Sequence, residues 1–309
     1  MARHVRLAAL LPVTAALAAC NGSLTVNLTD TPADGAASVV VDFTGMELHN
    51  TDGKTVTINF PSPQQIDLMQ LQNGATTALI QNQSVPAGTY DWMQLNVRAD
   101  KDTQGESYIT LNTGAQYPLY IPSGSEAGLK LTTSFTVAQN GSSQLLIEFN
   151  VRQSVTGADA DGQNYDLVPA MRLEDPAKVG TIAANVDLGA LASQQLGPGA
   201  QVAQCQGGLF VFSGGSAAPQ NGGGTSLVDF QPIPYFGTSP QASLSLPNLA
   251  KGTYTVAATC NYDLYAPTAV PGQSGYQTLH WTTQGNVSVT ANGTATVTLP
   301  SGTTSNTIK

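Results

Sequence analysis

The feature that most constrains the fold of this chain is an alternation of apolar and polar residues that recurs along most of its length. Three segments, Leu129–Val137, Leu145–Val151 and Tyr165–Leu173, show it clearly, because apolar residues recur there at odd-numbered positions (129, 131, 135 and 137; 145, 147, 149 and 151; 165, 167, 171 and 173). A strand with this period-two pattern buries one face and exposes the other, as the strands of an antiparallel sandwich do. Apolar residues make up 41% of the chain, and their regular alternation argues against intrinsic disorder.

Shorter alternating segments predict further strands. They cover residues 24–28, 39–48, 56–60, 90–97, 108–111, 119–121, 182–188, 205–212, 242–246, 254–262, 287–289 and 295–299. The apolar parity changes by one residue at Gly45, which predicts a β-bulge, and Asn50–Gly53 predicts a hairpin turn. Residues 61–84 are compatible with irregular structure or a helical turn, and a short helix is expected at 188–195.

The alternation divides into two halves. Glu174–Lys178 interrupts it, which predicts one domain over residues 20–174, a second over 179–300 and a frayed tail over 301–309. Each half carries the tripeptide Gly-Thr-Tyr directly before a strand, with Tyr90 in the first and Tyr254 in the second. A tyrosine at such a place can tie its hydroxyl to the preceding corner of a sandwich. The sequence therefore predicts an all-β chain with two antiparallel β-sandwich domains in series.

The first residues are typical of a secretory signal peptide. Arg3 and Arg6 precede an uncharged apolar run over residues 7–16, which is too short to span a membrane. The run ends in Leu17-Ala18-Ala19-Cys20, which resembles the lipobox of bacterial lipoproteins. The resemblance implies that residues 1–19 are removed and that Cys20, carrying acyl chains such as palmitate, becomes the N-terminus. The alternative is an ordinary cleavage site followed by an accidental cysteine.

The residue after the cysteine is Asn21, whereas aspartate at that place is the usual cue for retention in the inner membrane. Resemblance to that sorting rule implies the outer membrane, with the leaflet left open. Without residues 1–19 the chain has nine Lys and Arg against 20 Asp and Glu, a net charge of −11. Such an acidic protein is not expected to bind nucleic acid or anionic lipid. We therefore expect the membrane to be reached only through the acyl anchor, for which several chains are needed.

Cys205 and Cys260 remain once Cys20 is assigned to lipid. An even pair of cysteines in an exported protein predicts a disulfide. Metal ligation by the two is less favoured, since no histidine cluster lies near them in the sequence.

One loop has a pattern compatible with calcium. Oxygen-bearing side chains alternate from Asp159 to Asp166, with Asp159, Asp161 and Asp166 as the candidate ligands. The glycine and the twelfth residue, Ala170, do not fit an EF-hand loop. Because Asp161-Gly162 between two strands also signals a hairpin, calcium and a simple turn stay open as alternatives. A second acidic neighbourhood, at Asp30, Asp34 and Asp42, is a weaker candidate.

The chain is predicted not to be an enzyme. It has no G-x-S-x-G, H-E-x-x-H or phosphate-binding loop motif, and His49 and His280 stand in no recognisable pattern. Its acidic residues, which could act as a carboxylate pair on glycosides, sit mostly in turns. Exposed aromatic residues could instead form a sugar-binding platform; the candidates are Trp92, Tyr117, Tyr120, Tyr262, Tyr265 and Trp281.

The first half contains several ordered phrases: Leu24–Pro32, Val85–Tyr90, Leu129–Thr132, Glu148–Val155 and Tyr165–Leu173. Together they resemble one family of bacterial lipoproteins, called domain of unknown function 4382, and the likeness covers residues 23–173. It implies a β-sandwich but no catalytic residue, since the family has no established reaction. An Asp is common in the family's pattern where this chain has Asn150, which weakens a charged site there.

The second half is similar, more loosely, to the prealbumin-like modules that accompany carboxypeptidases as regulatory domains. Val179–Ile182, Leu246–Val256 and Val287–Leu299 carry this likeness, which implies a structural or binding unit. The combined expectation is a non-catalytic cell-envelope lipoprotein with a binding or structural role toward a protein, matrix or glycan partner. The alternative is a carbohydrate-binding or carbohydrate-active surface lipoprotein.

Overall fold

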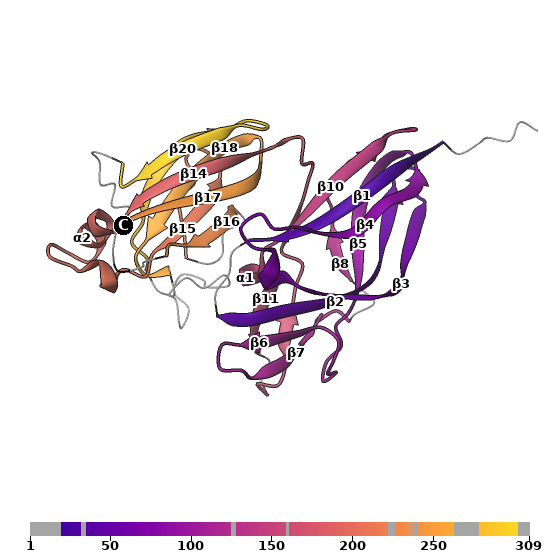
Figure 1. The fold of residues 1–309 in the computed structure, drawn as a ribbon, viewed down its shortest axis with the longest axis horizontal. Helices are drawn as coiled ribbons and strands as arrows, with labels where there is room; N and C mark the ends of the chain where they lie inside the picture. The colour runs from indigo at the N-terminus through magenta and orange to yellow at the C-terminus, as the bar shows by residue number, and fades with distance from the viewer. Residues whose placement is uncertain are drawn as a thin grey trace, which may run out of the picture.

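A computed structural model describes residues 20–31, 35–124, 128–158, 161–221, 226–234, 237, 240–262 and 278–301. The predicted signal peptide (residues 1–19) and residues 302–309 of the tail lie outside this range. The described residues form two β-sandwiches in series (Figure 1), so the predicted all-β fold is confirmed. None of the helices in this part of the chain is long and apolar enough to cross a bilayer.

In the described residues, the first sandwich contains thirteen strands, the 3-10 turn η1 and one turn of α-helix. Its elements are β1 (Asn21–Asp30), β2 (Ala36–Asn50), β3 (Thr55–Asp67), η1 (Leu68–Leu71), β4 (Thr77–Pro86), β5 (Gly88–Arg98), β6 (Tyr108–Leu111), β7 (Gln116–Tyr120), β8 (Leu129–Leu131), β9 (Phe135–Val137), β10 (Ser142–Phe149), α1 (Val151–Ser154), β11 (Val155–Ala158), β12 (Tyr165–Leu167) and β13 (Met171–Glu174).

Two sheets enclose the core of the first sandwich. One has four strands in the order β13-β10-β1-β4, and the other has nine, in the order β11-β12-β7-β6-β2-β5-β8 with β3 also on β2 and β9 also on β5. The alternation determines which face of each strand is buried. In β1, Leu24, Val26 and Leu28 are fully buried and pack in the same core as Phe43 and Leu95 of the facing sheet. The predicted bulge is confirmed, because the register of β2 shifts between Phe43 and Gly45.

Not all of the pairing is antiparallel. β1 runs parallel to β10, with Leu28 opposite Ile147, and β12 runs parallel to β7. In the second sandwich β14 is parallel to β20, with Ile182 opposite Ala295. Period-two alternation is the same in both kinds of sheet, so the sequence pattern does not distinguish them.

The second sandwich packs a three-stranded sheet, β17-β14-β20, on a four-stranded sheet, β16-β15-β18-β19. Its elements are β14 (Val179–Asp187), α2 (Leu188–Gln195), the 3-10 turn η3 (Val202–Gln204), β15 (Gly208–Ser213), β16 (Leu227–Pro232), β17 (Gln241–Ala250), β18 (Gly252–Thr259), β19 (Thr282–Val289) and β20 (Thr294–Leu299). The predicted helix over 188–195 is confirmed as α2, which the Asp187 carboxylate caps by accepting from the Ala190 N–H at 2.9 Å.

Some predicted elements differ from the observed ones. The strand expected over 129–137 is two strands, β8 and β9, and the one over 165–173 is divided between two sheets as β12 and β13. Cys205 precedes β15 rather than lying in it. The ambiguous segment 61–84 contains the end of β3, the helical turn η1 and the unpredicted strand β4, while β16 was also unpredicted.

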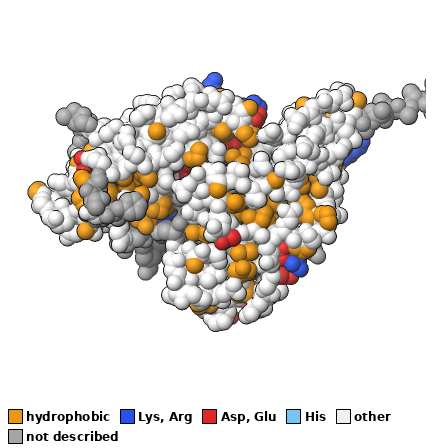
Figure 2. Space-filling model, viewed as in Figure 1, with side chains coloured by type: hydrophobic (Ala, Val, Ile, Leu, Met, Phe, Trp, Pro, Cys, Tyr) orange, Lys and Arg blue, Asp and Glu red, His pale blue; other side chains and the backbone are white. Residues whose placement is uncertain are grey.

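The two sandwiches meet end to end (Figure 1). Asp175–Lys178 links β13 to β14, and β16 of the second sandwich lies beside the end of the first that carries α1. β1 starts at the opposite end of the first sandwich, whereas α2 lies at the far end of the second. Few charged side chains lie on the face drawn in Figure 2, where most atoms belong to the backbone or to uncharged polar side chains. This agrees with the composition, since charged residues make up 10% of the chain against a typical share of roughly 25%.

Candidate functional site

The predicted lipidation residue stands at the outer tip of the first sandwich. Cys20 is exposed, and β1 begins at the very next residue, Asn21. The carbonyl of Cys20 accepts a 2.9 Å hydrogen bond from the Ala87 N–H, and that of Asn21 accepts one at 3.0 Å from Asn140. Cys20 is therefore fixed to the folded body with no intervening linker.

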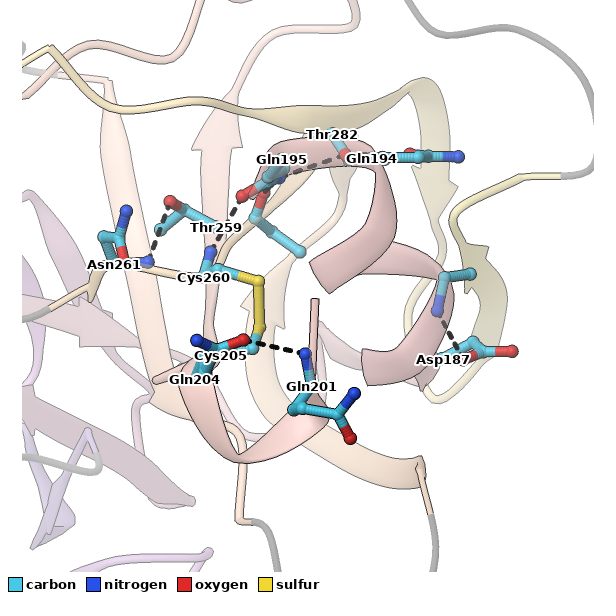
Figure 3. Close-up of a disulfide and its surroundings, with 12 residues drawn as sticks. Asp187, Gln194, Gln195, Gln201, Gln204, Cys205, Thr259, Cys260, Asn261 and Thr282 are labelled. Carbon is cyan, nitrogen blue, oxygen red and sulfur yellow. Dashed lines mark hydrogen bonds between the residues drawn. A yellow bond between two sulfur atoms is a disulfide. The ribbon is translucent and has the colours of Figure 1, made fainter. Parts of the chain in front are cut away.

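The structure joins Cys205 to Cys260, which confirms the predicted disulfide (Figure 3). Both residues are buried, at 4% and 0% exposure. Gln195, the last residue of α2, holds the helix on the same strand: its side chain accepts from the Cys260 N–H at 2.8 Å and donates to the Ala258 carbonyl at 3.1 Å. The disulfide and Gln195 together attach the α2 end of the sandwich to β18.

The loop proposed for calcium is the turn of the β11–β12 hairpin, so the hairpin alternative is confirmed. Asp161 is exposed in the turn and Asp166 lies opposite Thr156 in the ladder, while Asp159 is outside the described residues. Asn164 is buried and binds Asp102, accepting from its N–H at 2.9 Å and donating to its carboxylate at 2.8 Å. No three His, Cys, Asp or Glu side chains in the described ranges are grouped to hold a metal ion. Calcium binding at this loop stays a prediction.

The second acidic neighbourhood is not assembled as a site. Asp42 lies in the nine-stranded sheet, fully buried, and pairs with Arg98. Asp30 lies in the four-stranded sheet, where its carboxylate accepts from the Val151 N–H at 3.2 Å. Asp34 is outside the described residues.

The aromatic candidates do not form a sugar-binding platform in the described residues. Trp92 stacks on His49, with ring centroids 4.8 Å apart, and the Lys130 ammonium stands 3.9 Å from the Trp92 ring. Trp281 packs edge-on against Phe210 at 5.0 Å. Tyr117 packs on Tyr165, Tyr120 lies under Lys101, Tyr262 contacts Phe230, and Tyr265 is outside the described residues. Each of the candidate rings in the described residues therefore already contacts another side chain.

Sequence reasoning missed a buried cluster of charged residues at the joint between the two sandwiches. Asp30 (β1), Glu148 (β10) and Asp229 (β16) are 3%, 4% and 2% exposed. The Arg172 guanidinium (β13) pairs with the Glu148 carboxylate at 2.7 Å and lies 3.8 Å from Glu174. The cavity beside Asp30, Glu148 and Asp229 is only about 10 Å³, near the smallest that holds one water molecule.

The second sandwich buries this cluster. Ile147 and Phe149 of β10 point into the core of the first sandwich, so Glu148 between them faces outward. In an isolated first sandwich, this outward-facing side chain would be exposed to solvent. Pro247 and Asn248 of the second sandwich line the same small cavity and take the place of solvent. The signal available in the sequence is a charged residue, Asp229, between Val228 and Phe230 in an apolar strand.

Burial changes the proton affinity of these carboxyls. It raises the pKa of Glu148 from an ordinary 4.5 to about 8, with Arg172 opposing the shift. It raises the pKa of Asp229 from 3.8 to about 6, again against the attraction of Arg172. Burial also raises the pKa of Asp30 well above 3.8, opposed by the hydrogen bond from Val151. The cluster therefore retains protons at pH values where exposed carboxyls are ionised.

Arg152 of α1 makes a second contact across the joint. Its guanidinium lies 4.6 Å from the Phe230 ring centroid and donates a 3.0 Å hydrogen bond to the Tyr262 carbonyl. Gln231 adds a 3.4 Å side-chain hydrogen bond to Asn73 of the first sandwich. These contacts fix the sandwiches relative to each other by polar and aromatic groups as well as by packing.

A groove of about 660 Å³ opens on the first sandwich beside the link between the two domains. Residues 133–136, 142–145 and 173–178 line it. β13 pairs with β10 only from Leu146 to Phe149, so no strand of the described chain pairs on that side with Ser142–Leu145. The N–H and C=O of Gln144 face this side, because Ser23 takes its ladder bond from Gly141 and the direction alternates. Free strand edges of this kind can pair with an extended peptide.

Comparison with solved structures gives only distant likenesses. A leucine-rich repeat protein from Bacteroides thetaiotaomicron VPI-5482 is 14% identical with a TM-score of 0.23; the match covers 91% of this chain but 26% of that protein. GBS52, the minor pilin of Streptococcus agalactiae, is 10% identical with a TM-score of 0.18; the match covers 92% of this chain and 100% of that protein. The fimbrial anchor protein Mfa2 from Porphyromonas gingivalis is 12% identical with a TM-score of 0.17; the match covers 78% of this chain and 79% of that protein. TM-scores at this level assign no role.

No curated protein matches the chain. A family match does exist for the first sandwich, over residues 21–169, and the family is described as "Domain of unknown function (DUF4382)". The matched residues run from the first residue of β1 to two residues before β13. The resemblance expected from the sequence phrases is thereby confirmed for residues 21–169, which match the DUF4382 family.

Proposed function

We propose that this protein is a non-catalytic lipoprotein of the bacterial cell envelope that binds a partner in the groove of its first sandwich and holds its second sandwich away from the membrane. The observation that carries the proposal is the position of Cys20. It is exposed at the outer tip of the first sandwich, one residue before β1, and the second sandwich lies at the other end of the body (Figure 1). Acyl chains on Cys20 would leave the second sandwich as the part farthest from the bilayer.

The interior of the protein supports a structural role for its polar residues. His49 is stacked on Trp92 and hydrogen-bonded to Thr55 at 3.1 Å, and Asp42 is paired with Arg98. Arg152 on the Phe230 ring and its hydrogen bond to the Tyr262 carbonyl hold the two sandwiches together, as a spacer requires. Since the faces of Trp92 are covered by His49 and Lys130, the sugar-binding alternative has no observation in its favour.

The tether is tested by fractionating cells that express Cys20→Ala. We expect the wild type to sediment with membranes after a high-salt wash and the variant to be soluble or unprocessed. Asn21→Asp is the companion variant: it keeps the cysteine and should move the protein from the outer to the inner membrane. Membrane sedimentation of Cys20→Ala equal to that of the wild type would refute the anchor.

The binding role is tested by placing a photo-crosslinking amino acid at Gln144, in the groove, and at Thr57, an exposed strand residue on β3 that serves as the control. Irradiation of intact cells should join an envelope component to the Gln144 variant and not to the Thr57 variant. Equal labelling at both positions, or none at either, would contradict a partner in the groove and leave only the spacer role.

A further inference from the structure

The joint between the sandwiches encloses more acid than it can neutralise. Asp30, Glu148 and Asp229 are buried together, and of the cations that the structure describes, Arg172 pairs with Glu148 while Arg152 lies on the Phe230 ring. The other titratable groups that face this cluster are Glu174 of β13 and Tyr254 of β18, and neither supplies a positive charge. With all carboxyls ionised, the joint would hold a net negative charge with almost no water beside it.

Burying a charge without an opposite charge beside it costs free energy, and a carboxyl lowers that cost by staying protonated and neutral. Closing the joint removes solvent from carboxyls that belong to both sandwiches: Asp30 and Glu148 come from the first, and Asp229 comes from the second. Opening the joint returns all three to water, where each ionises. The number of bound protons therefore differs between the closed and the open joint.

We infer that the joint between the two sandwiches is a proton-dependent lock, which closes with uptake of protons onto the cluster of Asp30, Glu148 and Asp229 and weakens as the pH rises. The inference does not depend on the lipid anchor or on a partner. It concerns the angle and rigidity of the body, which the two sandwiches keep only while the joint is closed.

The direction of the pH dependence follows from the raised pKa values of the buried carboxyls. Their pKa values are raised in the closed joint, to about 8 for Glu148 and about 6 for Asp229. Between an ordinary value near 4 and these raised values, the closed joint binds more protons than the open one, so closure is most favourable at about pH 4 and below. Its advantage is lost as the pH rises above about 4, the share of Asp229 by about pH 6 and that of Glu148 by about pH 8, with roughly a tenfold rise in the opening constant per pH unit for each proton released.

The remaining contacts of the joint give a background that does not titrate in this range. Arg152 stays cationic on Phe230, and the Gln231–Asn73 pair is neutral. A substitution in the acid cluster should therefore change the pH dependence of opening, whereas a substitution at Arg152 should weaken the joint equally at every pH.

The test is hydrogen exchange with mass spectrometry on the intact protein from pH 5 to pH 8, corrected for the intrinsic rate. Peptides of the joint, covering 146–152 and 226–234, are compared with a β2 peptide from the first core. The variants are Asp229→Asn and Glu148→Gln, which resemble the protonated carboxyls. Asp91→Asn, an exposed acid on β5, is the control.

We expect the opening constant of the wild-type joint to rise about tenfold per pH unit between pH 6 and 8, while the β2 peptide stays level. Glu148→Gln should flatten this slope between pH 6 and 8, Asp229→Asn should flatten the slope between pH 5 and 6, and Asp91→Asn should keep both. A wild-type slope no steeper than that of β2, or an unchanged slope between pH 6 and 8 in Glu148→Gln, would overturn the inference.

A second measurement needs no variant and stays decisive if the substitutions prevent folding. Carbon-13 NMR of the wild-type side-chain carboxyls at pH 7 should show at least one that is still protonated. If every carboxyl has the shift of an ionised group at pH 7, the lock does not exist.

Discussion

Tyr90 and Tyr254 occupy equivalent corners of the two sandwiches. The hydroxyl of Tyr90 donates a 2.7 Å hydrogen bond to the carbonyl of Pro86, four residues earlier, and that of Tyr254 donates one at 2.6 Å to the carbonyl of Ala250. Both rings are buried, at 0% and 5% exposure. Each bond ties the start of a strand, β5 or β18, to the end of the strand before it, β4 or β17.

Tyr90→Phe and Tyr254→Phe should each lower the free energy of unfolding by about 1–2 kcal/mol. The phenylalanine ring fills the same space, but the Pro86 or Ala250 carbonyl loses its donor in a partly buried place. Urea denaturation measures the change. Tyr117→Phe, whose half-buried ring packs on Tyr165, is the control and should change stability by less than about 0.5 kcal/mol. Equal effects at all three tyrosines would mean that the corner bonds contribute nothing.

Gly45→Ala should destabilise the first sandwich by about 2 kcal/mol or more. A Cβ at Gly45 would collide with the carbonyl oxygen of Ile58 on the neighbouring strand, and backbone cannot move aside cheaply there. Gly157→Ala is matched to it, since nothing lies within 4 Å of a Cβ at that strand position. Thermal unfolding of the two variants should separate them, and a stable Gly45→Ala would contradict the close approach at the bulge.

Arg152→Ala should weaken the joint between the sandwiches by about 2 kcal/mol. The variant loses the guanidinium on the Phe230 ring and the hydrogen bond to the Tyr262 carbonyl, both partly desolvated. Hydrogen exchange of peptide 226–234 reports the loss. Lys101→Ala removes a cation 5.6 Å from the Tyr120 ring, within the first sandwich, and should leave this peptide unchanged. An equal effect from both substitutions would show that Arg152 does not act across the joint.

Removing the disulfide by replacing Cys205 and Cys260 with alanine should lower the stability of the second sandwich by up to about 4 kcal/mol. The bond closes a loop with a sequence separation of 55, and the chain-entropy argument gives about that value for the unfolded state. Replacing Cys20, which is exposed and belongs to the first sandwich, is the control. Two free thiols at Cys205 and Cys260 in the exported wild-type protein would exclude the bond.

The local features of this chain follow from its sequence for identifiable reasons. Burial of Leu129, Leu131, Phe135 and Val137 obeys the alternation because side chains of a strand point to opposite faces wherever the strand lies. The bulge at Gly45 and the helix over 188–195 are also local, since each depends on a parity change or a capping residue beside it. The tyrosine corners are likewise fixed within five residues.

The pairing of strands is not local. β1 pairs in parallel with β10, which lies more than a hundred residues away in the chain, and β12 and β13 enter different sheets although one alternating segment carries both. Alternation specifies which face of a strand is buried but not which strand lies beside it. For the same reason the free edge of Ser142–Leu145, where the groove opens, has no signature in the sequence.

The sequence by itself determined most of the strands, their buried faces, the corners and the cysteine pair, because each depends on residues close together or on the composition of one segment. Only the tertiary structure decided that Glu148, on the outward face of β10, is buried and that Asp229 meets it from the other sandwich. The reason is that the burial of an outward-facing side chain depends on what covers it. Here the cover is a second domain, and its placement turns ordinary surface acids into a cluster that holds protons.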